Sequence, residues 1–84
     1  MGYHYYGDIM KIEHKQKYKL LGLNIAYYRK LKGYTQENFA EKLNVDRTTI
    51  SKIELATCGV SLDVLFDISE LLNVPINQLF DFRD

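Results

Sequence analysis

Apolar residues recur at helical spacing between Gln36 and Leu55, a segment with the sequence QENFAEKLNVDRTTISKIEL. In its first half, Phe39, Ala40 and Leu43 stand at offsets that place them on one face of an α-helix. Ala40 is small enough to let another helix cross this face closely. The pattern therefore predicts a short helix that packs tightly against a neighbour.

The second half of the segment has an apolar face of its own, formed by Ile50 and Ile53. Between the two halves stands Asn44-Val45-Asp46. Asn is among the non-glycine residues that most readily accept a left-handed backbone, and Asp46 is suited to capping the helix that follows. Val45 can turn inward and fill the angle between the helices. The spacing predicts a helix-turn-helix motif that covers the whole segment.

The second helix of this motif has a polar face opposite its apolar one. At the α-helical step of about 100° per residue, five positions fall within one outward arc of roughly 140°. They are Arg47, Ser51, Leu55, Thr48 and Lys52. The arc offers a guanidinium, an ammonium group and hydroxyls, which hydrogen-bond guanine and thymine edges and phosphate oxygens. The polar face of an arbitrary amphipathic helix usually meets only water, but the preceding bend and the small Ala40 favour DNA contact here.

Three more helices are predicted around the motif. The first covers about residues 19–32, and Gly33 suits its end. Its apolar stripe consists of Leu21, Ile25 and Tyr28, with Leu20 and Leu31 at the edges. Thr35 caps the first helix of the motif, and Ser61 caps a fourth helix that ends at Asn73-Val74-Pro75. A fifth, short helix covers about residues 76–80.

The composition indicates one globular domain. The 84 residues are 46% hydrophobic and 26% charged, enough for a single modest core. No apolar run approaches the roughly 20 residues that span a bilayer, and the start of the sequence lacks the apolar region of a signal peptide. We therefore expect a cytoplasmic protein without membrane contact. Cys58 is the single cysteine, which excludes an internal disulfide.

No arrangement of residues predicts catalysis or metal binding. His4 and His14 have no cysteine or acidic partner at metal-ligand spacing, and they do not form a triad pattern with Ser51. The sequence also lacks a glycine-rich phosphate loop. We expect neither an enzyme nor a bound metal or cofactor.

Residues 1–17 are expected to form a partly ordered N-terminal arm before a domain of residues 18–82. A short strand and a disordered arm are comparable interpretations of residues 1–8, and residues 9–19 could instead extend the first helix. The basic side chains of this region are Lys11, Lys15, Lys17 and Lys19. They could lie along DNA phosphates or simply face water.

Charge is distributed unevenly although the formal net charge is zero. Residues 1–34 carry seven Lys/Arg and two acidic residues, a net +5, whereas residues 35–84 carry four and nine, a net −5. This asymmetry predicts one basic and one acidic surface. Because DNA needs only a local basic surface, a neutral total does not exclude DNA binding.

The order and spacing of these elements resemble the phage-repressor-like helix-turn-helix family, of the Cro/cI or Xre type. The matching segments are LGLNIAYYR, YTQENFAEKLNV, TTISKIE and SLDVLFDISELLNVPINQLF, within roughly residues 20–80. The resemblance implies an all-α, compact five-helix, lambda-repressor-like fold. It also implies sequence-specific binding to double-stranded DNA, with the recognition helix, residues 46–55, in the major groove.

The resemblance further implies roles for individual residues. Gln36 would contact phosphate and reach toward a base, and Thr49 would contact phosphate. Base reading is implied for Arg47, Thr48 and Lys52, and the arc described above adds Ser51 to the DNA-facing side.

A second implied feature is a partly buried ion pair between Arg29 and Glu54, which would tie the first helix to the end of the recognition helix. The sequence departs from the family at the following loop, where Ala56 replaces a usual Gly and Val60 a frequent Pro. Asn44 replaces another frequent Gly, which its tolerance of a left-handed backbone accommodates.

Such domains usually bind palindromic operators as homodimers. The fourth helix has a broader apolar surface than one partner helix requires, and this surface, with Phe80 and Phe82, is the expected dimer contact. Ordinary core packing and a frayed tail explain the same residues equally well.

Two functions follow from these observations. The leading hypothesis is a DNA-binding transcriptional regulator, either a repressor or a controller protein. The alternative is a protein-interaction module or antitoxin whose acidic C-terminal half binds a partner protein.

Overall fold

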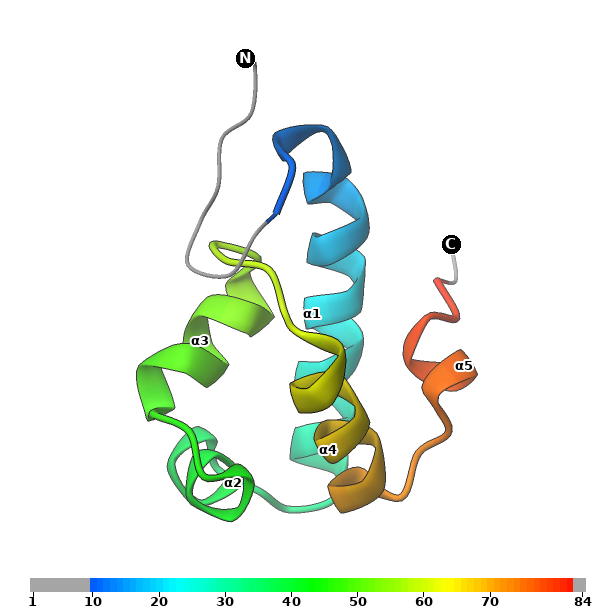
Figure 1. Ribbon diagram of the computed structural model, residues 1–84. Coiled ribbons are helices and arrows are strands. Elements are labelled where there is room, and N and C mark those ends of the chain that lie inside the picture. The colour runs from blue at the N-terminus through cyan, green and yellow to red at the C-terminus, as the bar shows by residue number, and fades with distance from the viewer. Residues whose placement is uncertain (1–9, 83–84) are drawn as a thin grey trace.

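Five α-helices and one short 3-10 turn make up the computed structural model, which describes residues 10–82. In chain order the elements are η1 (Ile12–His14), α1 (Lys15–Leu31), α2 (Gln36–Leu43), α3 (Arg47–Leu55), α4 (Leu62–Leu72) and α5 (Ile76–Leu79) (Figure 1). No strand occurs within the described range. The predicted all-α, five-helix architecture is confirmed.

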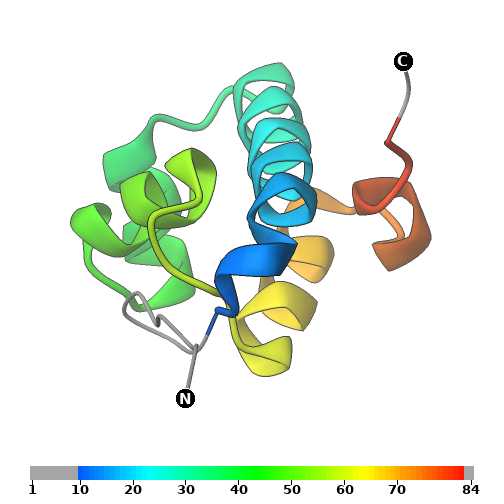
Figure 2. The ribbon, with the colours of Figure 1, turned by 90° about the horizontal axis from the view of Figure 1, so that it is seen from above.

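Helix α1 runs through the middle of the molecule. Helices α2 and α3 lie on one side of it and α5 on the other, as both views show (Figures 1 and 2). Helix α4 contacts α1, α2 and α5. Each α-helix contributes to one core, whose buried members are Leu21, Ile25, Tyr28, Phe39, Ala40, Ile50, Ile53, Cys58, Leu65, Ile68, Leu72, Val74 and Leu79. Burial of this apolar surface is the main force that holds the helices together.

Local capping signals fix where the helices begin and end. Thr35 Oγ1 accepts a hydrogen bond from the backbone N–H of Asn38 at 3.1 Å, and Ser61 Oγ accepts one from Val64 at 3.2 Å. Each bond satisfies an amide that has no partner within its own helix. Gly33, with φ of 86°, adopts the left-handed conformation just after α1. These caps are where the sequence predicts them.

The N-terminal part of the domain differs from the expectation. Helix α1 begins at Lys15, four residues before the predicted start, and Met10 is only 1% exposed. Residues 10–17, which were expected to belong to an arm, are therefore part of the folded domain. Residues 1–9, the rest of that predicted arm, lie outside the described residues. Of the alternative in which residues 9–19 extend the first helix, the structure agrees for residues 15–19, while residues 12–14 form the 3-10 turn η1.

Three smaller expectations also need correction. Asp46 occupies the N-cap position of α3, but its side chain makes no capping hydrogen bond. Helix α5 ends at Leu79 rather than at residue 80. Leu31, expected at the edge of the apolar stripe of α1, is 61% exposed, because its side chain lies outside the face that packs on the core.

Candidate nucleic-acid interface

Helix α3 has one buried and one exposed face. Ile50 and Ile53 are 1% and 5% exposed and belong to the core. The remaining predicted contact residues of this helix are Arg47, Thr48 and Lys52, which are exposed, and Thr49 and Ser51, which are half-buried. Figure 1 shows α3 at the edge of the molecule. The structure therefore brings the polar side chains together on a surface that DNA can approach.

The bend between α2 and α3 holds this surface at a fixed angle. Asn44 adopts a left-handed conformation with φ of 59°, as predicted, and its N–H donates to the carbonyl of Glu41 at 3.1 Å. The N–H of Val45 donates to the carbonyl of Ala40 at 3.0 Å. Ala40 is 2% exposed, and Val45 packs partly buried against the core. Backbone hydrogen bonds and packing together make the two helices one rigid unit.

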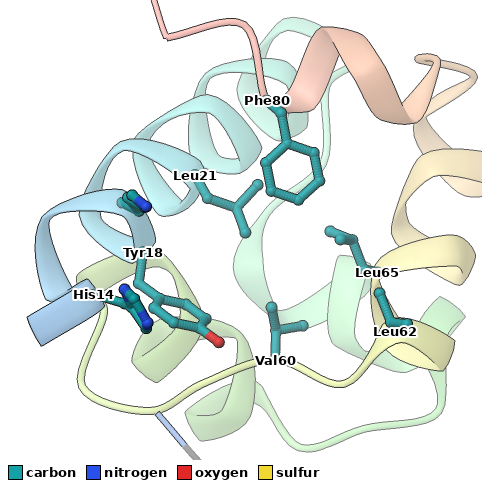
Figure 3. Close-up of a pocket in the computed structure, with 8 residues that line it drawn as sticks. His14, Tyr18, Leu21, Val60, Leu62, Leu65 and Phe80 are labelled. Carbon is teal, nitrogen blue, oxygen red and sulfur yellow. The ribbon is translucent and has the colours of Figure 1, made fainter. Parts of the chain in front are cut away.

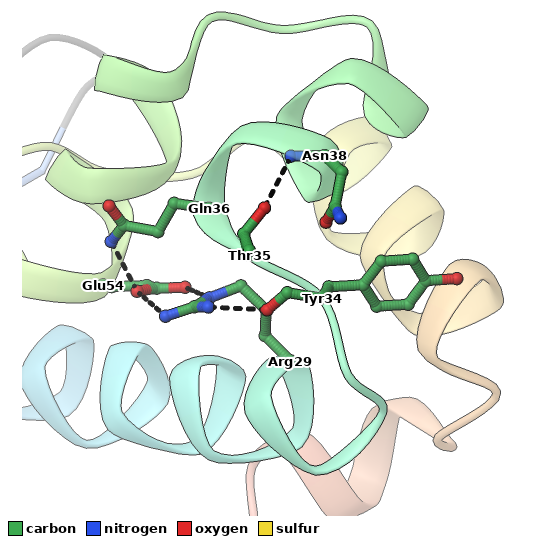
Figure 4. Close-up of polar contacts among 6 residues, drawn as sticks. All are labelled: Arg29, Tyr34, Thr35, Gln36, Asn38 and Glu54. Carbon is green, nitrogen blue, oxygen red and sulfur yellow. Dashed lines mark hydrogen bonds and ion pairs between the residues drawn. The ribbon is translucent and has the colours of Figure 1, made fainter.

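A buried ion pair ties α1 to the end of α3. Arg29 Nε donates to Glu54 Oε2 at 2.6 Å and Arg29 Nη2 to Glu54 Oε1 at 3.2 Å, with both side chains 7% exposed (Figure 4). Arg29 Nη1 also donates to the carbonyl of Tyr34 at 2.8 Å. The forked guanidinium thus meets the carboxylate at two atoms and holds the α1–α2 connection at the third.

Gln36 joins the same network from the first turn of α2. Its Nε2 donates to Glu54 Oε1 at 2.9 Å, and its carbonyl oxygen points away from that carboxylate (Figure 4). Because a carboxylate only accepts hydrogen bonds, the contact fixes which end of the amide faces Glu54. Glu54 therefore orients a side chain that is expected to contact DNA. Nothing in the local sequence pattern predicts this contact, because the two residues stand 18 positions apart.

The loop after α3 contains one departure from the family pattern, at Ala56. Ala56 is 0% exposed and left-handed, with φ of 58°. This conformation strains any residue with a Cβ, which accounts for the glycine usual at this position. The carbonyl of Ala56 accepts a hydrogen bond from Lys15 Nζ at 3.0 Å. The early start of α1 thus places a cation at the C-terminal end of α3, where it is favourable.

A second notable surface lies between α1, the α3–α4 loop, α4 and the C-terminal segment. It contains a cavity of about 340 Å³ lined by His14, Lys17, Tyr18, Leu21, Val60, Leu62, Leu65 and Phe80 (Figure 3). Two of the lining residues, Leu62 and Phe80, are 66% and 44% exposed, and Phe66, one turn after Leu62 on α4, is 48% exposed. Only part of the apolar surface of α4 is therefore used by the core.

Neither a metal-binding cluster nor a membrane-spanning helix is found among the described residues. Within residues 10–82, no group of three or more His, Cys, Asp or Glu residues is arranged to hold a metal ion. None of the helices in this range combines the length and the apolar character needed to cross a membrane.

Comparisons with known proteins agree with this architecture. A family model described as helix-turn-helix matches residues 25–79. An uncharacterized HTH-type transcriptional regulator of Methanocaldococcus jannaschii is 40% identical over 60 residues, which cover 71% of this chain and 91% of that protein.

Solved structures show the same similarity. The restriction-modification controller protein C.AhdI from Aeromonas hydrophila superimposes on this chain with a TM-score of 0.75 at 24% sequence identity. The match covers 80% of this chain and 97% of the C.AhdI chain, and it supports the fold. SinR, a master regulator for biofilm formation solved in complex with DNA, gives a TM-score of 0.67 at 35% identity, covering 73% of this chain and 98% of that one. The chain belongs to the helix-turn-helix family of the Xre and Cro/cI type.

Proposed function

We propose that this protein is a sequence-specific, double-stranded-DNA-binding transcriptional regulator. The observation that carries the proposal is the surface of α3, where Arg47, Thr48 and Lys52 stand exposed on a helix whose other face is fixed in the core. The rigid bend before α3 presents this surface at a set angle. A similar protein, SinR, has been solved in complex with DNA. We also propose a cytoplasmic location, because the DNA that such a regulator would bind lies there.

The side chains divide by chemistry into base-reading and phosphate-binding groups. The Arg47 fork matches guanine O6 and N7, while Thr48 and Lys52 stand beside it on the major-groove side. Thr49 and the amide groups at the start of α2, with Gln36, suit phosphate oxygens. Ser51 is half-buried one turn after Arg47 and offers a hydroxyl to either partner. The resulting readout is direct, from one helix in the major groove.

We further propose that the protein binds a palindromic operator as a homodimer. Leu62 and Phe80 are exposed apolar residues that line the cavity, and Phe66, also exposed, lies one turn after Leu62 on α4. Phe82 packs edge-on against Phe80 with ring centroids 6.1 Å apart. An isologous contact through this surface leaves α3 of each protomer free for one half-site. A dimer bound to such an operator would act as a repressor or a controller protein, by blocking RNA polymerase or by recruiting it.

One observation favours a second function. Asp63, Asp67 and Glu70 are all exposed at helical spacing along α4, which gives the C-terminal half an acidic row. This row suits a basic partner protein, as an antitoxin or interaction module would require. It does not overlap the DNA-facing residues of α3, so both functions can coexist.

Selection of bound sequences from random double-stranded DNA tests the leading proposal, with a gel shift on the DNA upstream of the protein's own gene as a second arm. Enrichment of one inverted repeat is the expected result. The gel shift is repeated with the product of the neighbouring gene, which separates the two functions. Failure to enrich any sequence, together with binding to that neighbouring product, would favour the interaction module.

A further inference from the structure

Leu55, the last residue of α3, is 67% exposed, the highest value among the large apolar side chains of the described residues. The residues on either side leave it no alternative position. Glu54 is held by Arg29 and Gln36, and Ala56 is 0% exposed. With the backbone fixed on both sides, the Leu55 side chain cannot turn into the core. Its exposure is therefore a fixed property of the fold.

Leu55 lies on the DNA-facing arc of α3 rather than beside it. It stands four residues after Ser51 and three after Lys52, so the three side chains are neighbours on the helix surface. By angle it falls between Arg47 and Lys52, near the middle of the arc. The nine residues of α3 span about 13 Å, comparable to the roughly 12 Å width of the major groove.

Other exposed apolar residues belong to different surfaces. Leu62 and Phe80 border the cavity beside α4, and Leu23, Tyr27 and Leu31 follow one another along the outer face of α1. Leu55 lines neither of these surfaces. It is an apolar group among the charged and hydroxyl groups of the recognition surface.

We propose that Leu55 is a specificity-determining residue that recognises the C5-methyl group of thymine in the major groove. This inference rests on the proposed function. The leucine side chain can neither donate nor accept a hydrogen bond, so it cannot hydrogen-bond the other major-groove groups or a phosphate. The thymine methyl is the apolar group that the four natural base pairs display there, and contact with it removes both surfaces from water.

The test begins with the sequence selected from random DNA by the wild-type protein. Each thymine of that operator is replaced in turn by deoxyuridine, which removes one methyl group and leaves every hydrogen-bonding group in place. We expect wild-type affinity to fall about fourfold at one position per half-site, the effect of one buried methyl group. For Leu55→Ala, the thymine-to-uracil affinity ratio at that position should fall to about one.

Leu23→Ala is the matched control, because Leu23 is 61% exposed on the outer face of α1. It should keep the wild-type ratio at every position, and circular dichroism should show all three proteins folded. The inference is overturned if Leu55→Ala retains the wild-type ratio, or if no uracil substitution changes wild-type affinity. Those outcomes leave sequence-specific binding intact. Failure to enrich any DNA sequence would instead overturn the proposed function and this inference together.

Discussion

A Cβ atom added at Gly22 would lie 2.5 Å from the carbonyl oxygen of Glu54 and 2.6 Å from that of Ile53. Helix α1 therefore crosses α3 in direct contact with its backbone. Glycine inside a helix normally costs about 0.5–1 kcal/mol relative to alanine, but here it permits the close approach. The crossing fixes the back of the recognition helix against the central helix of the fold.

Gly22→Ala should lower the free energy of unfolding, although alanine is the better helix former. Because the obstructing atoms are backbone, the helices must move apart, at a cost of about 1–3 kcal/mol. Urea unfolding followed by circular dichroism measures the loss. Ala26→Gly, a change in the reverse direction at a half-buried position of the same helix, supplies the propensity control. A Gly22→Ala protein as stable as wild type would contradict the close crossing.

Arg29→Ala should be strongly destabilising. It leaves the Glu54 carboxylate buried with Gln36 as its remaining side-chain donor, a loss on the order of 3–5 kcal/mol. Thermal and urea unfolding should show this loss, whereas Lys30→Ala, at an exposed neighbouring position, should change stability by less than about 0.5 kcal/mol. Where the mutant still folds at low temperature, its sequence preference should be unchanged. Equal melting temperatures for Arg29→Ala and Lys30→Ala would show that the Arg29–Glu54 ion pair does not stabilise the fold.

Ala56→Gly should raise stability. The left-handed conformation destabilises alanine by about 1–2 kcal/mol, and glycine removes this strain. Two effects reduce the gain in stability: the methyl group of alanine loses its packing contacts, and glycine gives the unfolded chain more conformational freedom. We expect a net gain of up to about 1 kcal/mol in urea unfolding. Asn44→Ala is the converse variant, because it introduces a less tolerant residue at another left-handed position, and should lower stability. A loss of stability in Ala56→Gly would mean that methyl packing outweighs the backbone strain.

Arg47→Ala should cost roughly 1–3 kcal/mol on the selected operator and relax the preference at one base position per half-site. Arg47→Lys keeps the charge but cannot contact guanine O6 and N7 with two parallel donors, so it should retain the salt dependence and lose the preference. Binding series on cognate and single-base-substituted DNA at two salt concentrations measure both effects. An equal loss on every sequence would instead identify Arg47 as a phosphate contact.

Leu62→Asp should break the proposed homodimer without unfolding the chain. Leu62 is 66% exposed at the first position of α4, where a negative charge is favourable for the helix. Sedimentation at micromolar concentration should give twice the 9.9 kDa of one chain for wild type and for Leu23→Asp, and a monomer for Leu62→Asp. A wild-type protein that sediments as a monomer, even with operator DNA, would refute the dimer.

Features that depend on near neighbours in the chain could be predicted from the sequence alone. The caps at Thr35 and Ser61, and the left-handed residues Gly33 and Asn44, follow from contacts within a few positions of each residue. The buried face of α3 follows from helical periodicity, and so does the shared exposure of Arg47 and its polar neighbours. These local rules sufficed for the element order, the bend and the exposed polar face of α3.

Features that join distant segments could not be predicted in this way, because they depend on how the helices pack. The early start of α1 is accompanied by a hydrogen bond between Lys15 and Ala56, 41 positions away. Position 22 requires glycine because the backbone of α3, a helix that begins 25 residues later, leaves no space there for a Cβ atom. The orientation of Gln36 likewise depends on Glu54, whose carboxylate reaches it only because α2 and α3 fold back on α1. Helical periodicity describes which face of one helix is apolar. It carries no information about which atoms of another helix will meet that face, because the crossing geometry is set by the packing of all five helices together.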